Sequence, residues 1–393
     1  MSDNGNAAGW PLEFGVFMPP ISTPVHHNTH LQLNDCVDLI THLDRLGFHE
    51  AWVGEHHSGG AELICSPEVF LAHTASRTRN IRLGTGVVSL PYHHPFTVAG
   101  RIALLDHLTA GRVIFGAGPG LLATDAYMLG IEPEQQRRMM GESLEVILEL
   151  FAGKRVTRET DWFRMNEAAL QVRPYQFPHP ELALAATFSP SGPTIAAKYG
   201  AGLLSLAAAT PAGFEVLAEH WGILESESGR YGRVPDRRSW RHVVAMHIAT
   251  TEAQAVKEVE WGLRATNEYL SGVLPGVTAD PSWSHSTLVE KSREGGFLIG
   301  TPEMAIDLIE RLKEKSGGFG KFLIMNLDLA DREARFRSFE LFAREVMPRF
   351  THASAGAIDS YDWSRAAGDR WLNRTVGAIK AAGGMRDTSA LRT

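Results

Sequence analysis

The chain has 393 residues, of which 44% are hydrophobic, and its 38 lysines and arginines stand against 45 aspartates and glutamates, which gives a formal net charge of −7. An acidic chain of this kind lacks the basic surface with which proteins bind nucleic acid, and it contains no run of roughly 18 apolar residues that could cross a membrane. The length suits one large barrel domain with insertions.

The N-terminus and the cysteines predict where the protein works. Residues 1–10 are small and polar, which predicts a flexible N-terminus without the charged-then-apolar order of a signal peptide. The two cysteines, Cys36 and Cys65, do not make a disulfide framework. We therefore expect a protein of the reducing cytoplasm.

The first half of the chain alternates short apolar runs with longer helical patterns. Strand-like runs and the helices after them follow in the order Glu13–Met18 and His30–Leu46, Glu50–Gly54 and Pro67–Thr78, Ile81–Ser89 and Pro95–Leu108, Arg112–Gly116 and Gln135–Phe151. In the last of these helices, Met140, Leu144, Ile147 and Phe151 share one face. Four strand–helix units in succession indicate a parallel sheet.

Two stretches of the second half interrupt this alternation. Residues 153–173 carry scattered aromatic side chains and predict a hairpin-like insertion after the fourth strand. Residues 274–296 are rich in Pro, Gly and Ser, lack a period, and predict a structureless loop after the seventh strand, which is a candidate lid.

Four further strand-like runs complete the pattern. They cover Glu181–Ala186, Gly202–Leu206, Trp240–Thr250 and Lys321–Leu327, and the helices between and after them cover Pro193–Tyr199, Ala212–Glu225, Glu252–Tyr269, Thr301–Lys315 and Glu333–Val346. Eight strand–helix units predict an α/β fold, a (β/α)8 TIM barrel over residues 11–352, with residues 353–393 as a C-terminal tail. An open doubly wound sheet is the alternative.

Two stretches of the chain resemble a known family. EAWVGEHH at Glu50–His57, and the run from IRLGTG to GAGPG at Ile81–Gly120, are similar to the second to fourth strands of the bacterial luciferase-like flavin-dependent monooxygenases. Later segments at Thr187–Gly200, Gly300–Ile309 and Glu345–Phe350 match in order, so the resemblance extends from about Leu12 to Phe350. The motifs EHHSGG and LGTGVVSLPYHHP are most similar to the limonene 1,2-monooxygenase-like members.

The resemblance implies an activity with its cofactors and partners. It implies a TIM-barrel monooxygenase that uses reduced flavin and O₂, by way of a C4a-peroxyflavin, to oxygenate a small lipophilic organic substrate. Reduced FMN is the expected flavin, FAD is the alternative, and NAD(P)H acts directly or through a separate flavin reductase. A homodimer is expected. The alternatives are an F420-dependent hydride-transfer oxidoreductase of the same superfamily and a non-catalytic flavin-binding barrel, and the EHH motif favours the oxygenase.

Histidines at two strand ends are the candidate catalytic residues. His56 and His57 follow the second strand, and because neighbouring side chains on an extended chain point opposite ways, one of them faces the pocket. By the family match this is His56, which could hold or move a proton; a buried structural histidine is the alternative. His94, after the third strand, matches a second family histidine, and a surface turn is its alternative. None of the three histidine doublets has zinc-helix spacing, so no metal is expected.

The resemblance also assigns cofactor-binding positions. Thr85, Gly86 and Val87 match a bulge behind the flavin ring, which implies a cis peptide bond between Gly86 and Val87, with a plain strand as the alternative. The further matching positions are Glu55, Gly118, Thr187 and Ser189. Ser189 precedes a helix and could bind phosphate or simply cap that helix.

One family feature is missing. Pro119 stands where luciferases proper carry an arginine that binds the flavin phosphate, and Arg101, Arg112 and Arg137 are possible substitutes. The aromatic and sulfur side chains that could line an apolar pocket are Phe17, Met18, Trp52, Phe188 and Trp283.

Overall fold

The computed structural model describes residues 10–19, 21–22, 28–273 and 277–383. The chain divides into two units, Met1–Met347 and Pro348–Thr393. The expected flexible N-terminus lies, except for Trp10, outside the described residues. No helix in the described ranges is long and apolar enough to cross a membrane.

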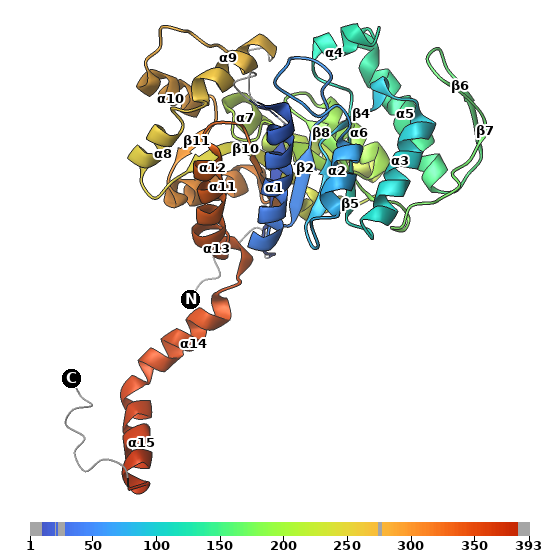
Figure 1. The fold of residues 1–393 in the computed structure, drawn as a ribbon. Helices are drawn as coiled ribbons and strands as arrows, with labels where there is room; N and C mark the ends of the chain where they lie inside the picture. The colour runs from blue at the N-terminus through green and yellow to red at the C-terminus, as the bar shows by residue number, and fades with distance from the viewer. Residues whose placement is uncertain (1–9, 20, 23–27, 274–276, 384–393) are drawn as a thin grey trace. The chain divides into compact units, whose positions relative to one another are not determined.

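The first unit is built on eight parallel strands, which hydrogen bonds join into a closed ring. Figure 1 shows these strands with helices on either side. In hydrogen-bonded order these are β1 (Glu13–Met18), β2 (Glu50–Val53), β3 (Arg82–Thr85), β5 (Val113–Gly118), β8 (Glu181–Ala186), β9 (Gly202–Ser205), β10 (Arg241–Ile248) and β12 (Lys321–Met325). Because β12 pairs with both β10 and β1, the ring has no open edge. The predicted TIM barrel is confirmed, and the open-sheet alternative is wrong.

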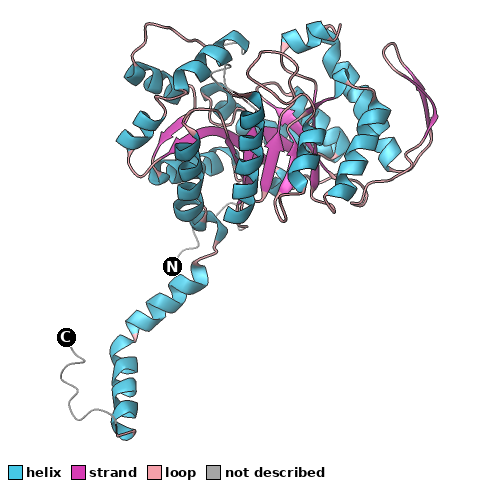
Figure 2. Cartoon of the chain, viewed as in Figure 1, coloured by secondary structure: helices cyan, strands magenta, loops and turns pink. Residues whose placement is uncertain are grey.

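Helices surround the strands, as Figure 2 shows. Those that follow the barrel strands are α1 (Thr29–Leu46), α2 (Pro67–Ala75), α3 (Pro95–Leu108), α5 (Gln136–Phe151), α6 (Ser191–Tyr199), α7 (Pro211–Arg230), α8 (Glu252–Glu258), α11 (Pro302–Ser316) and α12 (Arg332–Leu341). Helix α11 shows why such segments begin and end where they do. The hydroxyl of Thr301 accepts from the amide of Met304, Pro302 occupies the first turn, and Gly317 stops the helix at φ 74°.

Apolar side chains fill the interior of the barrel. The buried cluster consists of Phe17, Trp52, Ile114, Ala183, Leu204, Val243 and Leu323. Trp52, fully buried, turns its indole N–H toward the Glu50 carboxylate, 2.8 Å away. Of the side chains predicted to line a pocket, Phe17, Met18 and Trp52 are therefore core residues, whereas Phe188 is 52% exposed.

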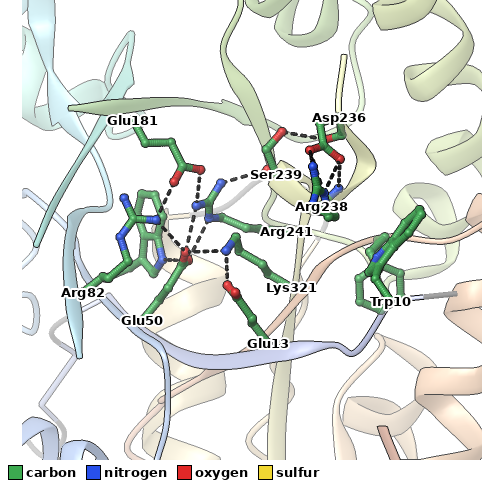
Figure 3. Close-up of polar contacts among 12 residues, drawn as sticks. Trp10, Glu13, Glu50, Arg82, Glu181, Asp236, Arg238, Ser239, Arg241 and Lys321 are labelled. Atoms are coloured by element: carbon green, nitrogen blue, oxygen red, sulfur yellow. Dashed lines mark hydrogen bonds and ion pairs between the residues drawn. The ribbon is translucent and has the colours of Figure 1, made fainter. Parts of the chain in front are cut away.

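Charged side chains close the barrel at the amino-terminal ends of its strands (Figure 3). Six strands begin with a charged residue that joins this network, namely Glu13, Glu50, Arg82, Glu181, Arg241 and Lys321. Arg241 is fully buried and donates to both oxygens of Glu50 at 2.8 Å. Burial alone would raise the pKa of Glu50, but the Arg241 guanidinium holds it far below its ordinary value. The amino-terminal end of the barrel is therefore occupied by paired charges.

The region between α5 and β8 carries a hairpin. Strands β6 (Val156–Glu159) and β7 (Arg164–Ala168) pair antiparallel, inside the range 153–173. Two short strands also extend the ring: β4 (Val88–Ser89) pairs with the end of β5, and β11 (Leu298–Gly300) pairs with the end of β10.

The segment 274–296 differs from its prediction. Residues 274–276 lie outside the described residues, but α10 (His285–Glu294) follows, so the expectation of a structureless loop is wrong. Ser284 caps α10 by accepting from the Thr287 amide at 3.1 Å. The helix buries Leu288 and Val289 side by side, which is too short an apolar pattern to show a helical period in the sequence.

Two other parts of the helical prediction differ from the structure. The single helix expected over Glu252–Tyr269 is divided into α8 and α9 (Leu263–Val273). The division lies at Gly262, whose amide donates to the Leu329 carbonyl and where an added Cβ would lie 2.0 Å from the Asp328 carbonyl oxygen. Helix α4 (Ala123–Met128) has six residues and carries no periodic pattern.

The second unit is helical. It contains α13 (Pro348–Thr351), α14 (Ala355–Ala366) and α15 (Gly368–Ala381), and residues 384–393 lie outside the described part. The rings of Trp363 and Trp371 join α14 to α15 at a centroid distance of 5.2 Å. The predicted tail therefore includes regular helices.

Candidate active site

The carboxyl-terminal end of β2 carries the central histidine of the site. Just past this strand, His56 turns Nδ1 toward Oδ2 of Asp125, 3.0 Å away. Helix α4 supplies Asp125, whose side chain is fully buried and whose other oxygen accepts from the His57 amide at 3.1 Å and the Ser58 hydroxyl at 2.5 Å. These contacts fix both the histidine and the loop after it.

A second carboxylate faces the other nitrogen of His56. Nε2 lies 3.1 Å from Oε2 of Glu62, which belongs to the β2–α2 loop. The other oxygen of Glu62 accepts a hydrogen bond from the hydroxyl of Tyr269 at 2.9 Å. Asp125, His56, Glu62 and Tyr269 therefore form a continuous chain of contacts, contributed by α4, the β2–α2 loop and α9.

This arrangement favours a positively charged His56. Burial alone would lower the pKa of His56, but the hydrogen bond to Asp125 and the charge of Glu62 raise it above its ordinary value. Burial raises the pKa of Glu62, while hydrogen bonds from His56 and Ser58 overcome burial and lower the pKa of Asp125. The imidazolium form of His56 is therefore favoured by one hydrogen bond, to Asp125, and by the nearby charge of Glu62.

A separate cluster surrounds Glu55, which is 2% exposed. Its Oε1 lies 2.9 Å from Nε2 of His57 and 2.5 Å from Nε2 of His93, and its Oε2 accepts from the Ser89 amide at 2.7 Å. Burial would raise the pKa of Glu55, but the hydrogen bonds from the two histidines lower it. His56 and His57 thus contact different carboxylates, Asp125 and Glu62 for His56 and Glu55 for His57.

The Glu55 cluster is also the candidate for a metal site. Among the described residues, Glu55, His57 and His93 form the group whose ligand atoms lie within 4.8 Å of one another. Two histidines and a carboxylate are a ligand set that zinc uses. Here both carboxylate oxygens accept hydrogen bonds, so the cluster is satisfied as a hydrogen-bonded structure.

The bond predicted behind a flavin ring is present: the peptide bond between Gly86 and Val87 is cis. Thr85 is fully buried, and its hydroxyl exchanges hydrogen bonds with the backbone of Gly116 at 2.8 and 2.9 Å, which ties β3 to β5. Gly118 makes room for Val87, because an added Cβ would lie 2.5 Å from a methyl group of Val87. These residues therefore shape the strand ends through the backbone.

Apolar and hydroxyl side chains follow several barrel strands. Val87, Leu206 and Met325 are only partly buried and pack on the sealed cluster inside the barrel, and these three side chains are called the apolar floor. Thr187 is exposed just after β8, and the hydroxyl of Ser189 lies 2.6 Å from that of Ser191 at the start of α6. Hydroxyl groups at the N-terminus of a helix such as α6 are of the kind that can bind a phosphate.

His94 is placed apart from these contacts. It is exposed at the start of α3, where Nε2 lies 3.3 Å from the carbonyl oxygen of Arg164 and the ring lies 5.9 Å from that of Phe163, on the β6–β7 hairpin. Its neighbour His93 contacts Glu55 instead. A catalytic role of His94 stays a prediction.

Pro119, which stands at the position of the absent arginine, makes a contact through its backbone. The carbonyl of Pro119 accepts from the Gln136 side chain at 2.9 Å. Of the possible substitutes, Arg112 donates to the carbonyls of Thr109 and Ile81 just before β5 and β3, at the opposite end of the barrel. Arg101 pairs with Glu68 at 3.0 Å.

Several residues of the site were not predicted from the sequence. They are Glu62, His93, Asp125 and Tyr269. Asp125 follows the glycine-rich turn by five residues, which is a usable signal for a side chain near a strand end. Tyr269 lies 207 residues from Glu62, and no local pattern links the two.

Comparison with known proteins places the chain among oxygenases. The family model described as luciferase-like monooxygenase matches residues 12–318. The chain is 50% identical over 340 residues to limonene 1,2-monooxygenase from Rhodococcus erythropolis, covering 86% of this chain and 87% of that protein. It is 42% identical over 356 residues to 4-hydroxyprotoasukamycin monooxygenase from Streptomyces nodosus subsp. asukaensis, covering 90% and 96%.

The fold also matches a solved structure. The FMN complex of the oxygenating constituent of 3,6-diketocamphane monooxygenase from Pseudomonas putida superimposes with a TM-score of 0.72 at 23% identity, covering 86% of this chain and 99% of that chain. This likeness supports the barrel architecture.

Proposed function

Because the chain belongs to the luciferase-like monooxygenase family, we propose that it is a flavin-dependent monooxygenase that uses reduced flavin and O₂ to oxygenate a small lipophilic substrate. The structural observation that carries this proposal is His56, which follows barrel strand β2, hydrogen-bonds to Asp125 through Nδ1 and lies 3.1 Å from the Glu62 carboxylate at Nε2. The named relatives favour oxygenation over F420-dependent hydride transfer and over a barrel without catalysis.

The expected cofactor is reduced FMN. Val87 and the backbone of Gly86 would lie against its ring, and Thr187 and Ser189 would approach its phosphate. The flavin supplies the activation of O₂. FMN is present in the structural neighbour described above, which supports the choice of FMN over FAD.

The residues of this chain bind and orient the substrate and the flavin, and they supply a proton. The apolar floor formed by Val87, Leu206 and Met325 keeps water away from the reacting groups. His56 holds a proton at Nε2 beside Glu62, and its orientation is fixed through Nδ1 by Asp125. The hydrogen bond to Asp125 and the charge of Glu62 raise the pKa of His56 above its ordinary value, which favours the protonated form. His94, which is exposed at the start of α3, is proposed as a second residue that contacts the substrate.

The substrate class follows from the relatives and the floor. Limonene, a hydrocarbon, is the substrate named for the relative that is 50% identical. An apolar floor suits such a compound because its binding removes apolar surface from water. We therefore propose a small cyclic or aromatic lipophilic substrate, with limonene as the first compound to test.

The partners are a reductase, which draws on NAD(P)H, and a second copy of the chain. The phrase "oxygenating constituent" in the name of the structural neighbour supports a separate reductase. Val69 on α2 and Leu104 and Leu108 on α3 are 66%, 55% and 61% exposed, and this apolar surface supports a homodimer through these helices. The free thiols of Cys36 and Cys65 support a cytoplasmic location.

The test combines the purified chain, chemically reduced FMN, limonene and ¹⁸O₂. We expect a product that contains one ¹⁸O atom, detected by mass spectrometry, and no such product without flavin. Parallel assays with reduced FAD and with reduced F420 under anaerobic conditions separate the alternatives. Substrate reduction by F420 without O₂, or the lack of oxygenated product across a panel of terpenes and aromatic compounds, would contradict the proposal.

A further inference from the structure

We propose that Glu62 and Tyr269 are positioning residues for His56, and that through them helix α9 sets how firmly His56 holds its proton. The proposal rests on the proposed function and deepens it, because Glu62 contacts His56 directly and Tyr269 contacts Glu62. It assigns a task to Tyr269, which the sequence predicted only as the last residue of a helix over Glu252–Tyr269.

The contacts make α9 part of the site. Tyr269 is half-buried, and its hydroxyl donates to Glu62 at 2.9 Å, while the other oxygen of Glu62 lies 3.1 Å from Nε2 of His56. The β2–α2 loop is shaped for this tyrosine. Gly59 has a φ of +83°, and a Cβ at this position would lie 2.8 Å from the Tyr269 hydroxyl oxygen.

The backbone of Glu62 is held independently. It forms an antiparallel bridge with Ile21, and the neighbouring Ala61 carbonyl accepts from the Ser22 amide at 2.8 Å. The side chain of Glu62 can therefore respond to Tyr269 while the loop stays in place. This separation makes Tyr269 a specific contact to the carboxylate and not a support of the loop as a whole.

Helix α9 is fixed by the elements around it. Leu263 and Leu270 of α9 belong to the same buried cluster as Leu288 and Val289 of α10 and Ile299 of β11. A displacement of this group of helices would carry Tyr269 with it. The position of helices α9 and α10 and the charge of Glu62 next to His56 are thus linked through the hydroxyl group of Tyr269.

The direction of the effect follows from the charges. An ionised Glu62 stabilises the imidazolium form of His56, and the hydrogen bond from Tyr269 favours the ionised form of Glu62 against burial. Burial first, and the charge of Glu62 second, raise the pKa of Tyr269, so its hydroxyl stays a donor. Loss of either residue therefore makes His56 easier to deprotonate.

The other ionisable groups that face these residues come from three elements. Asp125 of α4 and Glu55 at the end of β2 both raise the pKa of His56, and His57 is turned toward Glu55. Tyr92, in the turn after β4, has a pKa that burial raises to about 12 and stays neutral. These groups remain in the variants below, so a change can be assigned to Glu62 and Tyr269.

The experiment is an NMR titration of the full-length protein without flavin, with ¹³C-labelled histidine and with the His56 signal assigned from its loss in His56→Gln. We expect Glu62→Gln to lower the pH midpoint of His56 and Tyr269→Phe to lower it less. We expect the double variant to match Glu62→Gln alone, because Tyr269 acts only through Glu62. The alkaline limb of the oxygenation rate should move to lower pH in the same order.

Two matched controls test specificity. Glu268→Gln changes an exposed neighbour on α9, and Tyr127→Phe changes a tyrosine that is 86% exposed on α4; neither should move the midpoint. An unchanged midpoint in both Glu62→Gln and Tyr269→Phe, or additive shifts in the double variant, would overturn the inference. The titration needs no flavin. If the midpoints shift as expected but the protein oxygenates no substrate, the inference is supported and the proposed function fails. If the protein oxygenates a substrate but the midpoints stay unchanged, the proposed function is supported and the inference fails.

Discussion

Asp125 and Glu62 hold opposite nitrogens of one imidazole, at 3.0 Å from Nδ1 and 3.1 Å from Nε2 of His56. Each carboxylate comes from a different element after a different barrel strand. The ring can therefore neither flip nor turn away without the loss of a buried contact. Asp125 is fully buried and also anchors the loop that carries His56. Of the two carboxylates, Asp125 is therefore the one that fixes the position of His56.

The first prediction concerns Asp125. Asp125→Asn keeps the shape of the side chain but removes the charge that holds Nδ1, so His56 loses part of its orientation and its raised pKa. We expect oxygenation to fall by about 10²-fold, the lower range for a lost acid–base group, with more of the consumed O₂ released as H₂O₂. Product and peroxide are measured together. Equal efficiency in Asp125→Asn and the exposed control Tyr127→Phe would be incompatible with this role.

The second prediction concerns the pH dependence of stability through His56. Its pKa in the folded protein is raised, so its contribution is fully present below the unfolded value of about 6.5 and is lost as pH rises through the folded value. The free energy of unfolding of the wild type should therefore exceed that of His56→Gln by more at pH 6 than at pH 9. Urea denaturation at the two pH values measures this difference. A gap that widens with rising pH would show that the sign is wrong.

The third prediction concerns His242 on β10, whose contribution to the pH dependence of stability has the opposite sign to that of His56. Its ring stacks on Phe319 at 4.0 Å, neither nitrogen has a hydrogen-bond partner among the described residues, and burial lowers its pKa to about 3. Below about pH 6.5 His242 binds a proton in the unfolded chain but not in the folded protein. The free energy of unfolding therefore falls as the pH falls, by about 2 kcal/mol between pH 8 and pH 5.

The matching variant is His242→Phe, which keeps a ring between Trp240 and Phe319. It should lose less stability than the wild type over the same pH interval, as measured by denaturant unfolding. Parallel losses in the two proteins would rule out His242 as the titrating group.

The fourth prediction concerns the charges that close the barrel. Arg241→Met leaves Glu50 buried without its main partner and Glu181 without one of its two arginines, and should destabilise the fold by about 3–5 kcal/mol, as expected for a broken buried pair. Arg238→Met, on the exposed pair with Asp236, is the matched control and should change stability little. Similar thermal midpoints for both variants would mean that the buried network is not stabilising.

The fifth prediction concerns the Glu55 cluster. Both oxygens of Glu55 already accept hydrogen bonds from His57, His93 and the Ser89 amide, so no ion is needed to satisfy them. Dialysis against a chelator should leave the oxygenation rate unchanged, and metal analysis of the purified protein should find no stoichiometric zinc. A loss of activity that zinc restores would identify the cluster as a metal site.

The sequence predicts the strands far better than the contacts of the site. Glu13–Met18 and Glu181–Ala186 coincide with the observed strands because a buried parallel strand is a local apolar run. Asp125 was not found because α4 is too short to show a period. Tyr269 was not found because its partner is contributed by the other end of the barrel sequence, and only the closure of the ring brings them together.

The family resemblance predicted features that the residues alone did not. The cis bond between Gly86 and Val87 and the position of His56 at a strand end were both expected from matching motifs. In the doublet His93–His94, His93 lies against Glu55 and His94 against the Arg164 carbonyl, so the catalytic role that the matching gave to His94 stays a prediction. A single residue decides which of two adjacent side chains faces inward.

The charged residues that begin six of the barrel strands have a consequence for the evolution of this protein. They fasten the strands at the end remote from the candidate active site, and each sits at the same place in its strand, so they fix the mutual register of the ring. Loops at the other end can then lengthen, shorten or exchange residues without loosening the scaffold. Substrate range is therefore free to diversify among such enzymes, and libraries that vary the β2–α2 loop or the segment after β10 should retain folded members.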